Sequence, residues 1–298
     1  LRTDAPAPVD AEKMIERAIT FLRSQQDEKT GGWSISDEAP NFPAISSLVL
    51  TGMLMQPGLD HTDPAIARGV AYVLSNQKPD GAIYESLLPS YNTSISLSML
   101  ARVKTPEAKS AMDRAVAFLK GLQLSEATIT FNAAGEEAKA VDKDHPFYGG
   151  VGYGRHGRPD LSNLQWFLQG LHDAGTPGDD AAFQRALVFL QRTQMLESVT
   201  IKDEDGIERT VVINDMPYAK GSTQGGFIYA TSENRDTVGQ GQSNAPMMEE
   251  TLSDGTTASR LRCYGSMTYA GFKSYLYANL KKDDPRVTAA MDWIARNY

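Results

Sequence analysis

The sequence has little cysteine, no excess of basic residues and no long apolar run, and each absence excludes a class of protein. Its single cysteine, Cys263, cannot form an internal disulfide, so cysteine usage says little about the compartment. The 29 Lys and Arg against 37 Asp and Glu give a net charge of −8. This charge disfavours binding to nucleic acid or to an anionic membrane, because phosphate contacts need clustered positive charge. No apolar run approaches the roughly 20 residues of a transmembrane helix.

The remaining composition is that of an ordinary globular protein. Hydrophobic residues make up 41% of the 298 residues and charged residues 22%. Such a chain buries about 75% of the surface that it exposes when unfolded, so it needs no crosslink to fold. The sequence starts with Leu1 rather than Met, and we expect that an upstream segment was removed. One interpretation is a signal peptide and export, with residues 1–9 as an extended leader and 10–298 as one domain.

One pattern recurs along the chain: Arg, then Ala or Gly, then an aromatic–aliphatic pair, then Gln. The copies are Arg17–Gln26, Arg68–Gln77, Arg114–Gln123 and Arg185–Gln194, with a worn fifth copy at Ala289–Ile294. Each copy lies late in a segment with helical apolar spacing. Three of these helices begin with a capping residue followed by proline, at Asp63, Thr105 and Asp284. The repeats therefore predict a series of amphipathic helices.

A second set of segments alternates with the first and carries much less charge. These segments are Ala44–Met55, Asn92–Val103, Asp160–Ala174 and Tyr264–Leu280. A helix without a charged face is covered on most sides. The alternation predicts an all-α fold, an α/α toroid of about 4.5 helix pairs in which five outer helices surround four inner ones. It would form an incomplete (α/α)6-like barrel.

Glycine-containing turns join each outer helix to the next inner helix, and the later turns carry insertions. The insertions are 124–147, 195–224 and 231–262. One of them is predicted to hold a β-hairpin, with Val199–Ile201 and Thr210–Ile213 flanking Asp205-Gly206. All three precede inner helices, so we expect them to crowd one rim of the toroid. Long loops gathered on one rim indicate the functional face.

These repeats resemble the QW-type repeats of squalene–hopene cyclases and related terpene cyclases and prenyltransferases. The first repeat carries the whole motif, from Arg17 through Gln26 to Gly31-Gly32-Trp33, whereas the second has Ile83 in place of the tryptophan. The likeness spans nearly the whole chain. It implies a central, largely apolar cavity for a small apolar or amphiphilic ligand such as an isoprenoid, with or without an anionic head group.

The catalytic signatures of these relatives are absent. Cyclases of this class protonate an alkene or epoxide with an Asp-x-Asp-Asp cluster, in which mutual repulsion keeps one carboxyl protonated. Here Asp160 stands alone at the start of an inner helix, where it is either an N-cap or a general acid. His156 and Tyr153 complete the candidate catalytic set. The zinc ligands of the prenyltransferases are also incomplete, with Leu261 at the aspartate position and no His after Cys263. We therefore predict no metal and no cofactor.

Basic residues gather just before two of the predicted inner helices. Arg155, His156 and Arg158 precede the helix at Asp160, and Arg262 precedes the helix at Tyr264. Helix N-termini attract anions as well, which predicts a cationic mouth above an apolar cavity. The alternative interpretation is that these arginines form ion pairs with Asp160, Glu249 or Glu250 and thereby pin the insertions in place. The candidate ligand-binding residues are Arg155, Arg158, Asn163, Trp166, Tyr229, Arg262, Tyr264 and Tyr269.

Three hypotheses of function follow. The first is a toroid that binds an isoprenoid. The second is an exported polysaccharide lyase, in which an Arg neutralises a uronate while Tyr153 or His156 abstracts the adjacent proton. The third is a non-catalytic scaffold for protein contacts. The helix predicted at Pro285–Tyr298 has no inner partner after it, so we expect the native chain to continue. The oligomeric state stays open.

Overall fold

The computed structural model describes residues 10–36, 42–126, 130–131, 137–138, 141–154, 158–202, 205–234 and 236–298, and the predicted leader lies outside them. Helices predominate in these residues and alternate between two layers. The outer layer holds α1 (Ala11–Ser24), α3 (Pro64–Ser75), α5 (Pro106–Leu122), α7 (Ala181–Thr193) and α9 (Pro285–Asn297). The inner layer holds α2 (Pro43–Leu54), α4 (Pro89–Leu100), α6 (Leu161–Asp173) and α8 (Gly265–Tyr277). The predicted five outer and four inner helices are confirmed for the described residues.

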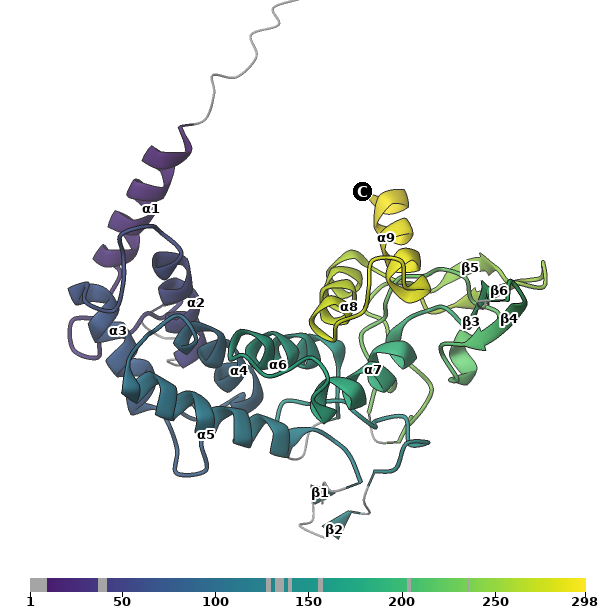
Figure 1. The fold of residues 1–298 in the computed structure, drawn as a ribbon, viewed down its shortest axis with the longest axis horizontal. Helices are drawn as coiled ribbons and strands as arrows, with labels where there is room; N and C mark the ends of the chain where they lie inside the picture. The colour runs from purple at the N-terminus through teal and green to yellow at the C-terminus, as the bar shows by residue number, and fades with distance from the viewer. Residues whose placement is uncertain are drawn as a thin grey trace, which may run out of the picture.

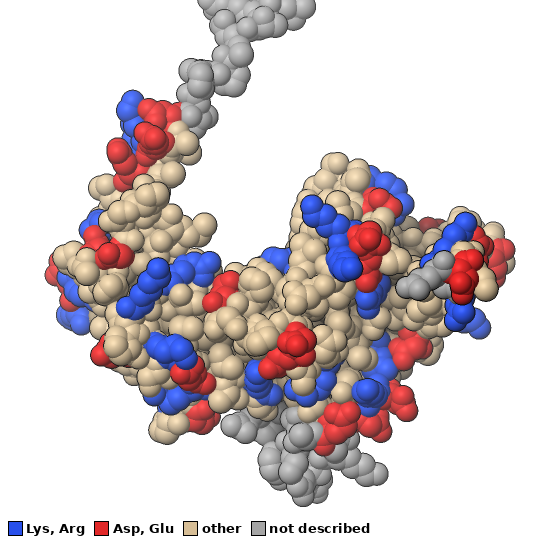
Figure 2. Space-filling view, in the orientation of Figure 1, with Lys and Arg blue, Asp and Glu red and all other residues tan. Residues whose placement is uncertain are grey.

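The inner helices pack side by side in chain order, and the outer helices cover them. Helix α4 contacts α2 and α6, and α6 contacts α8, while α3, α5 and α9 lie against α2, α4 and α8. Figure 1 shows the result as an open arc with α1 at one end and α8 and α9 at the other. Figure 2 shows the same arc hollowed between these two ends. The molecule is an incomplete α/α toroid. None of the helices in the described ranges is both long and apolar enough to cross a bilayer.

The glutamine that ends each sequence repeat joins that repeat to the next one. The Gln26 amide nitrogen donates to the carbonyl oxygens of Gly31 and Ala65, both at 2.8 Å, and its oxygen accepts from Arg68 at 2.6 Å. The same three bonds join Gln77 to Gly81, Ala111 and Arg114, and Gln123 to Gly149, Ala182 and Arg185. We call this set of bonds the glutamine staple. It explains why arginine, glycine and glutamine recur together in the sequence.

The fourth staple differs from the others because the fifth sequence repeat lacks the arginine. The Gln194 amide donates to Gly225 and Arg286, as the pattern requires. Ala289 replaces the arginine in the fifth repeat, and the buried hydroxyl of Tyr275 donates to Gln194 instead, at 2.8 Å. A residue of an inner helix thus takes over the role of the missing outer-helix arginine.

The glycine of the staple is required by both conformation and space. Gly31 has a φ of +79°, and a Cβ there would lie 2.9 Å from the Arg68 carbonyl oxygen. Two residues on, buried Trp33 lies between the layers, and its indole nitrogen donates to the Leu22 carbonyl at 2.7 Å. The turn therefore holds α1 against the next repeat through backbone contacts as well as through the staple.

The predicted caps form, but α4 is shifted by three residues at both ends, and α8 ends at Tyr277, three residues before the predicted end at Leu280. The side chains of Asp63, Thr105 and Asp284 accept from first-turn amides of α3, α5 and α9. Helix α4 begins at Pro89, three residues before the predicted start at Asn92. Its N-cap is Leu88, which has a φ of 53° and no side-chain bond to the helix. A helix that starts without a polar cap gives no such signal in the sequence.

Each insertion carries a two-stranded antiparallel hairpin. The predicted hairpin is present as β3 (Ser198–Lys202) and β4 (Glu208–Val212). Two further hairpins were not expected, β1 (Thr130–Phe131) with β2 (Glu137–Ala138), and β5 (Met248–Thr251) with β6 (Thr257–Arg260). The last pair has largely polar strands, which hides the alternation typical of a half-buried strand. Its Asp254-Gly255 turn, with Gly255 at a φ of +84°, was the available signal.

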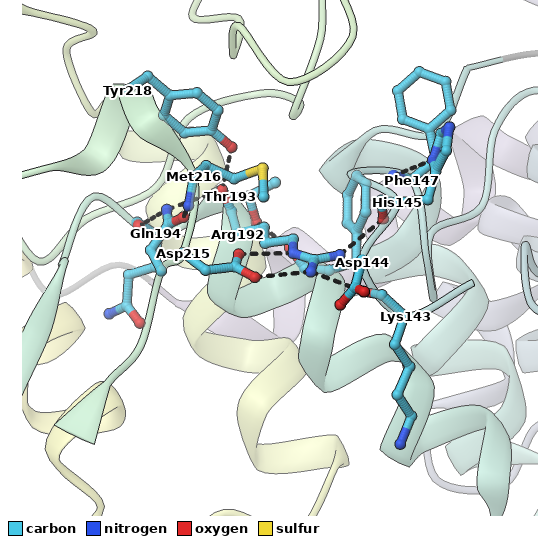
Figure 3. A network of polar contacts seen from close by, with 12 residues as sticks. Lys143, Asp144, His145, Phe147, Arg192, Thr193, Gln194, Asp215, Met216 and Tyr218 are labelled. Carbon is cyan, nitrogen blue, oxygen red and sulfur yellow. Dashed lines mark hydrogen bonds and ion pairs between the residues drawn. The ribbon is translucent and has the colours of Figure 1, made fainter. Parts of the chain in front are cut away.

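Buried Arg192 of α7 ties the first insertion to the second (Figure 3). Its guanidinium donates twice to the Asp215 carboxylate, both at 2.9 Å, and once each to the carbonyls of Lys143 and His145 at 2.8 Å. The third insertion is tied to the second through buried Glu250. The Glu250 carboxylate accepts from the Ser222 hydroxyl, the Thr223 amide and the Gln224 side chain. The three insertions are therefore linked one to the next.

Candidate functional site

Asp160 lies immediately before the first residue of α6 and is fully buried. One carboxylate oxygen accepts from the Asn163 backbone amide at 2.8 Å, and the other from the Asn163 side chain at 2.9 Å. Asp160 is thus the N-cap of α6, one of the two roles considered for it. Its burial among other functional groups leaves the second role, that of a proton donor, open as well.

Burial raises the pKa of the Asp160 carboxyl above its ordinary value. The hydrogen bonds from Asn163, the nearby charge of Arg158 and a contact with Tyr229 act in the opposite direction and offset only part of this effect. The carboxyl therefore keeps its proton to a higher pH than an exposed aspartate does. A general acid needs this property at the pH where it works.

Tyrosines from four separate segments gather around Asp160. The hydroxyls of Tyr153 and Tyr229 are hydrogen-bonded at 2.7 Å, and the ring of Tyr153 stacks on Tyr91 with centroids 5.7 Å apart. The Tyr91 hydroxyl is bonded to Ser162, near the start of α6. Tyr264, the residue before α8, bonds through its hydroxyl to the Asn244 side chain. We call Tyr91, Tyr153, Tyr229 and Tyr264 the tyrosine cluster.

Tyr91, Tyr229 and Tyr264 stay neutral at physiological pH. Burial raises the pKa of Tyr91 and of Tyr264 to about 12. Burial also raises the pKa of Tyr229, and the proximity of the Asp160 carboxyl adds to the effect. These three tyrosines therefore present uncharged rings and hydroxyls at the point where the N-terminal ends of α4, α6 and α8 meet. Such a surface suits an apolar ligand that also carries a polar or cationic group.

Arg158 lies against the same cluster. Its guanidinium is 5.2 Å from the centroid of the Tyr229 ring, and its Nε donates to the Glu233 carbonyl. It forms no ion pair with Asp160 or with another carboxylate of the described residues. The contact with Glu233 ties Arg158 to the third insertion, as the pinning alternative proposed, but through the backbone rather than through Glu249 or Glu250.

Buried polar atoms without a protein partner lie among these residues. Arg158 Nη1 and Asn163 Oδ1 are both inaccessible and make no hydrogen bond with the part of the chain that the structure describes. Thr231 Oγ1 and Gln242 Oε1, in the third insertion that follows Tyr229, are also buried and without a hydrogen-bond partner among the described residues. Buried polar atoms in proteins are normally hydrogen-bonded. The Arg158 guanidinium as a donor, the Asn163 and Gln242 oxygens as acceptors and the Thr231 hydroxyl as either are thus available here to a polar group.

The other predicted residues lie elsewhere. Trp166 is half-buried on α6, with Lys273 Nζ 5.3 Å from its ring centroid. Tyr269 on α8 is 47% exposed and contacts Tyr298 edge-on. Arg262 lines a cavity at the α9 end of the arc rather than the tyrosine cluster. Arg155 and His156 lie outside the described residues, so their part in the cationic mouth stays a prediction.

Two residues near the inner helices were not predicted from the sequence. Tyr91 was placed outside its helix because the start of α4 was predicted too late. Lys273 is half-buried between α6 and α8, donates to Gln169 Oε1 at 2.8 Å and lies over the rings of Trp166 and Tyr277. Burial lowers the pKa of its ammonium group. The signal for Lys273 was present, since it is the one charged residue in the otherwise uncharged stretch 263–280.

The described ranges hold no candidate metal site. No three His, Cys, Asp or Glu side chains are arranged there to hold a metal ion. Cys263 is buried against Met195 and Trp293, and burial raises the pKa of its thiol well above the ordinary value. A neutral, packed thiol of this kind behaves as a small apolar side chain.

Comparison with known proteins places the chain in a family. The model of the squalene-hopene cyclase C-terminal domain matches residues 39–206, more than half of the chain, and the protein belongs to that family. A search of curated proteins finds no match.

Among solved structures, a variant of the type II terpene cyclase MstE from Scytonema, in complex with its product merosterolic acid A, is similar. The TM-score is 0.51 at 12% identity, over 98% of this chain and 65% of the cyclase. At this identity the likeness shows the fold, and the chain spans about two thirds of the cyclase's length. A variant of a family 10 polysaccharide lyase from Cellvibrio cellulosa, with trigalaturonic acid, matches at 11% identity over 97% of this chain and 98% of the lyase. Its TM-score of 0.35 is too low to support an argument.

Proposed function

We propose that this protein binds an isoprenoid or a similar apolar ligand against the tyrosine cluster, with Asp160 as the proton donor of the site. The observation that carries the proposal is the convergence of four tyrosines on one buried carboxyl where three inner helices begin. Membership of the squalene-hopene cyclase C-terminal domain family supports it. The product bound to the similar Scytonema cyclase supports an apolar ligand in this fold.

The chemistry of such a site follows from its groups. A protonated Asp160 transfers its proton to one carbon of an alkene, whose π electrons form the new C–H bond and leave a carbocation on the other carbon. The carboxylate that remains is stabilised by the two hydrogen bonds from Asn163. The tyrosine rings offer their negative faces to the carbocation. Arg158, whose Nη1 has no partner in the described residues, provides a donor for an anionic head group.

Binding is tested with farnesol and squalene, both in detergent micelles, by titration calorimetry on the wild-type chain. Tyr229→Leu removes the ring between Asp160 and Arg158, and we expect it to weaken binding by roughly tenfold, as the loss of about 1.4 kcal/mol implies. Tyr298→Leu is the matched control, because Tyr298 is 75% exposed at the end of α9. Equal affinity of the Tyr229→Leu variant and the control would argue against a ligand at the tyrosine cluster.

A further inference from the structure

A cavity lies at the α9 end of the arc, between the start of α8 and the end of α9. It has a volume of about 240 Å³. Its lining residues come from the second and third insertions, from the approach to α8 and from α9, and they are Gln224, Met248, Arg262, Cys263, Trp293, Arg296 and Asn297. Arg262 is the one residue that this cavity shares with the site residues predicted from the sequence.

Two arginines give this cavity its charge, and neither is neutralised. The Arg262 guanidinium makes no hydrogen bond or ion pair with any residue that the structure describes, and Arg296 donates only to the Gln224 carbonyl, at 3.0 Å. Asp292 lies one turn before Arg296 on α9, but no ion pair joins them. Both arginine side chains are exposed and have no carboxylate partner among the described residues, so they give this part of a chain with a net charge of −8 a local positive charge.

The nearest buried carboxylate is already occupied. Glu250 lies behind Gln224, and its two oxygens accept from Ser222, Thr223 and Gln224. Glu250 is therefore held in the protein interior, and it forms no ion pair with either arginine. Its bond also fixes the Gln224 side chain, whose oxygen accepts from the Cys263 amide at 3.0 Å. The polar wall of the cavity is thus rigid before any ligand enters.

Another part of the cavity is apolar. The buried Trp293 ring and the Met248 side chain line it, and the neutral Cys263 thiol completes it. A cavity lined by two guanidinium groups and an indole ring fits a small molecule with a charged end and an apolar body. Guanidinium groups match the geometry of carboxylates and phosphates, whose paired oxygens accept two parallel hydrogen bonds.

We propose that this cavity is a binding site for a small oxyanion, a carboxylate or a phosphate ester, held by Arg262 and Arg296 with its apolar part against Trp293. The site is separate from the tyrosine cluster and does not depend on the function proposed above.

The test is calorimetric titration of the full chain with inorganic phosphate, acetate and benzoate, each at the same ionic strength. We expect saturable binding of phosphate or benzoate, and benzoate to bind more tightly than acetate because of the apolar wall. Arg262→Gln and Arg296→Gln should each weaken binding by about tenfold to a hundredfold. Arg17→Gln, the same change on α1 at the other end of the arc, should leave binding unchanged.

The outcomes separate the alternatives. Tighter binding of phosphate identifies a phosphate ester as the ligand class, and tighter binding of benzoate identifies a carboxylate. Because the Arg262 guanidinium has no partner among the described residues, Arg262→Gln should leave the melting temperature unchanged, so a loss of binding in that variant cannot come from misfolding. The proposal is overturned if none of the three anions binds saturably, if benzoate and acetate bind equally, or if Arg262→Gln binds as the wild type does.

Discussion

Replacement of Arg192 by methionine should release the first insertion from the second and destabilise the protein by about 3 kcal/mol. The guanidinium makes four hydrogen bonds, two to Asp215 and one each to the carbonyls of Lys143 and His145. Breaking a fully buried ion pair costs about 3–5 kcal/mol. Arg192 is 4% exposed, but the Asp215 side chain is 54% exposed and regains water when its partner is lost, which places the expected cost at the lower end.

The assay is urea unfolding of the wild type, Arg192→Met and Arg192→Lys, with the free energy of unfolding and the m-value both reported. Lysine keeps the charge but lacks the planar fork, so it can satisfy the carboxylate or the carbonyls but not both. We expect Arg192→Lys to fall midway between the other two. Lys202→Met is the control, because the Lys202–Glu208 pair on the neighbouring hairpin is exposed and such pairs contribute at most about 1 kcal/mol.

The pH dependence provides an independent check. The hydrogen bond from Arg192 is the main reason that the pKa of Asp215 lies below its ordinary value. A depressed pKa stabilises the folded state above the unfolded-state pKa, and this contribution is lost as the pH falls through the folded-state value. The difference between wild type and Arg192→Met should therefore shrink in acid. A cost below about 1 kcal/mol at pH 7, or an Arg192→Lys variant as stable as wild type, would refute the reasoning.

Two further predictions concern Asp160 and the first glutamine staple. Asp160→Asn keeps a good N-cap, and because a raised carboxyl pKa makes the wild type lose stability as pH rises through that value, the variant should be less sensitive to pH in thermal melts from about pH 4 to 8. If Asp160 donates a proton, the same variant should bind farnesol but form no product from it. The same pH dependence of the melting temperature in wild type and variant would contradict the first expectation. Product formation by the variant would contradict the second. Gln26→Ala removes three hydrogen bonds, so the amides of α1 should lose about 3 kcal/mol of protection in hydrogen exchange, whereas Gln25→Ala, an exposed neighbour, should change little. Equal protection in the two variants would mean that the staple does not hold α1.

The repeats made the fold predictable. Apolar spacing, the caps at Asp63 and Thr105 and the recurrent arginine–glutamine pattern are all local signals, and they indicated the two helical layers and their order. The hairpin around Asp254-Gly255 was missed because its strands are polar and its turn stood within a long insertion. Patterns within a single segment therefore predicted the structure correctly where the residues follow the usual chemistry of caps and turns.

The site was predictable only in part, because its residues meet through packing between helices. Asp160 was predictable because it lies at the start of a helix. Tyr91 belongs to another helix and lies near Asp160 through the contact of α4 with α6. No local pattern encodes that contact. Arg262 looked equivalent to Arg158 in the sequence, since both precede inner helices. In the structure, however, the two arginines lie in different places. Tyr264, the residue before α8, belongs to the tyrosine cluster, whereas Arg262 lines the cavity at the α9 end of the arc.

The glutamine staples determine how the arc should respond to mechanical force. Each staple joins one repeat to the following one, so a load applied between α1 and α9 passes through the four staples in series. A pulling experiment should extend the chain in discrete steps rather than in one rupture, as expected of repeat proteins whose units contact only their neighbours. Helix α1 contains no fully buried residue and is held by its staple, the Trp33 turn, the Arg23–Asp63 ion pair and the partly buried side chains of Ile19 and Leu22. It should give the first and weakest step.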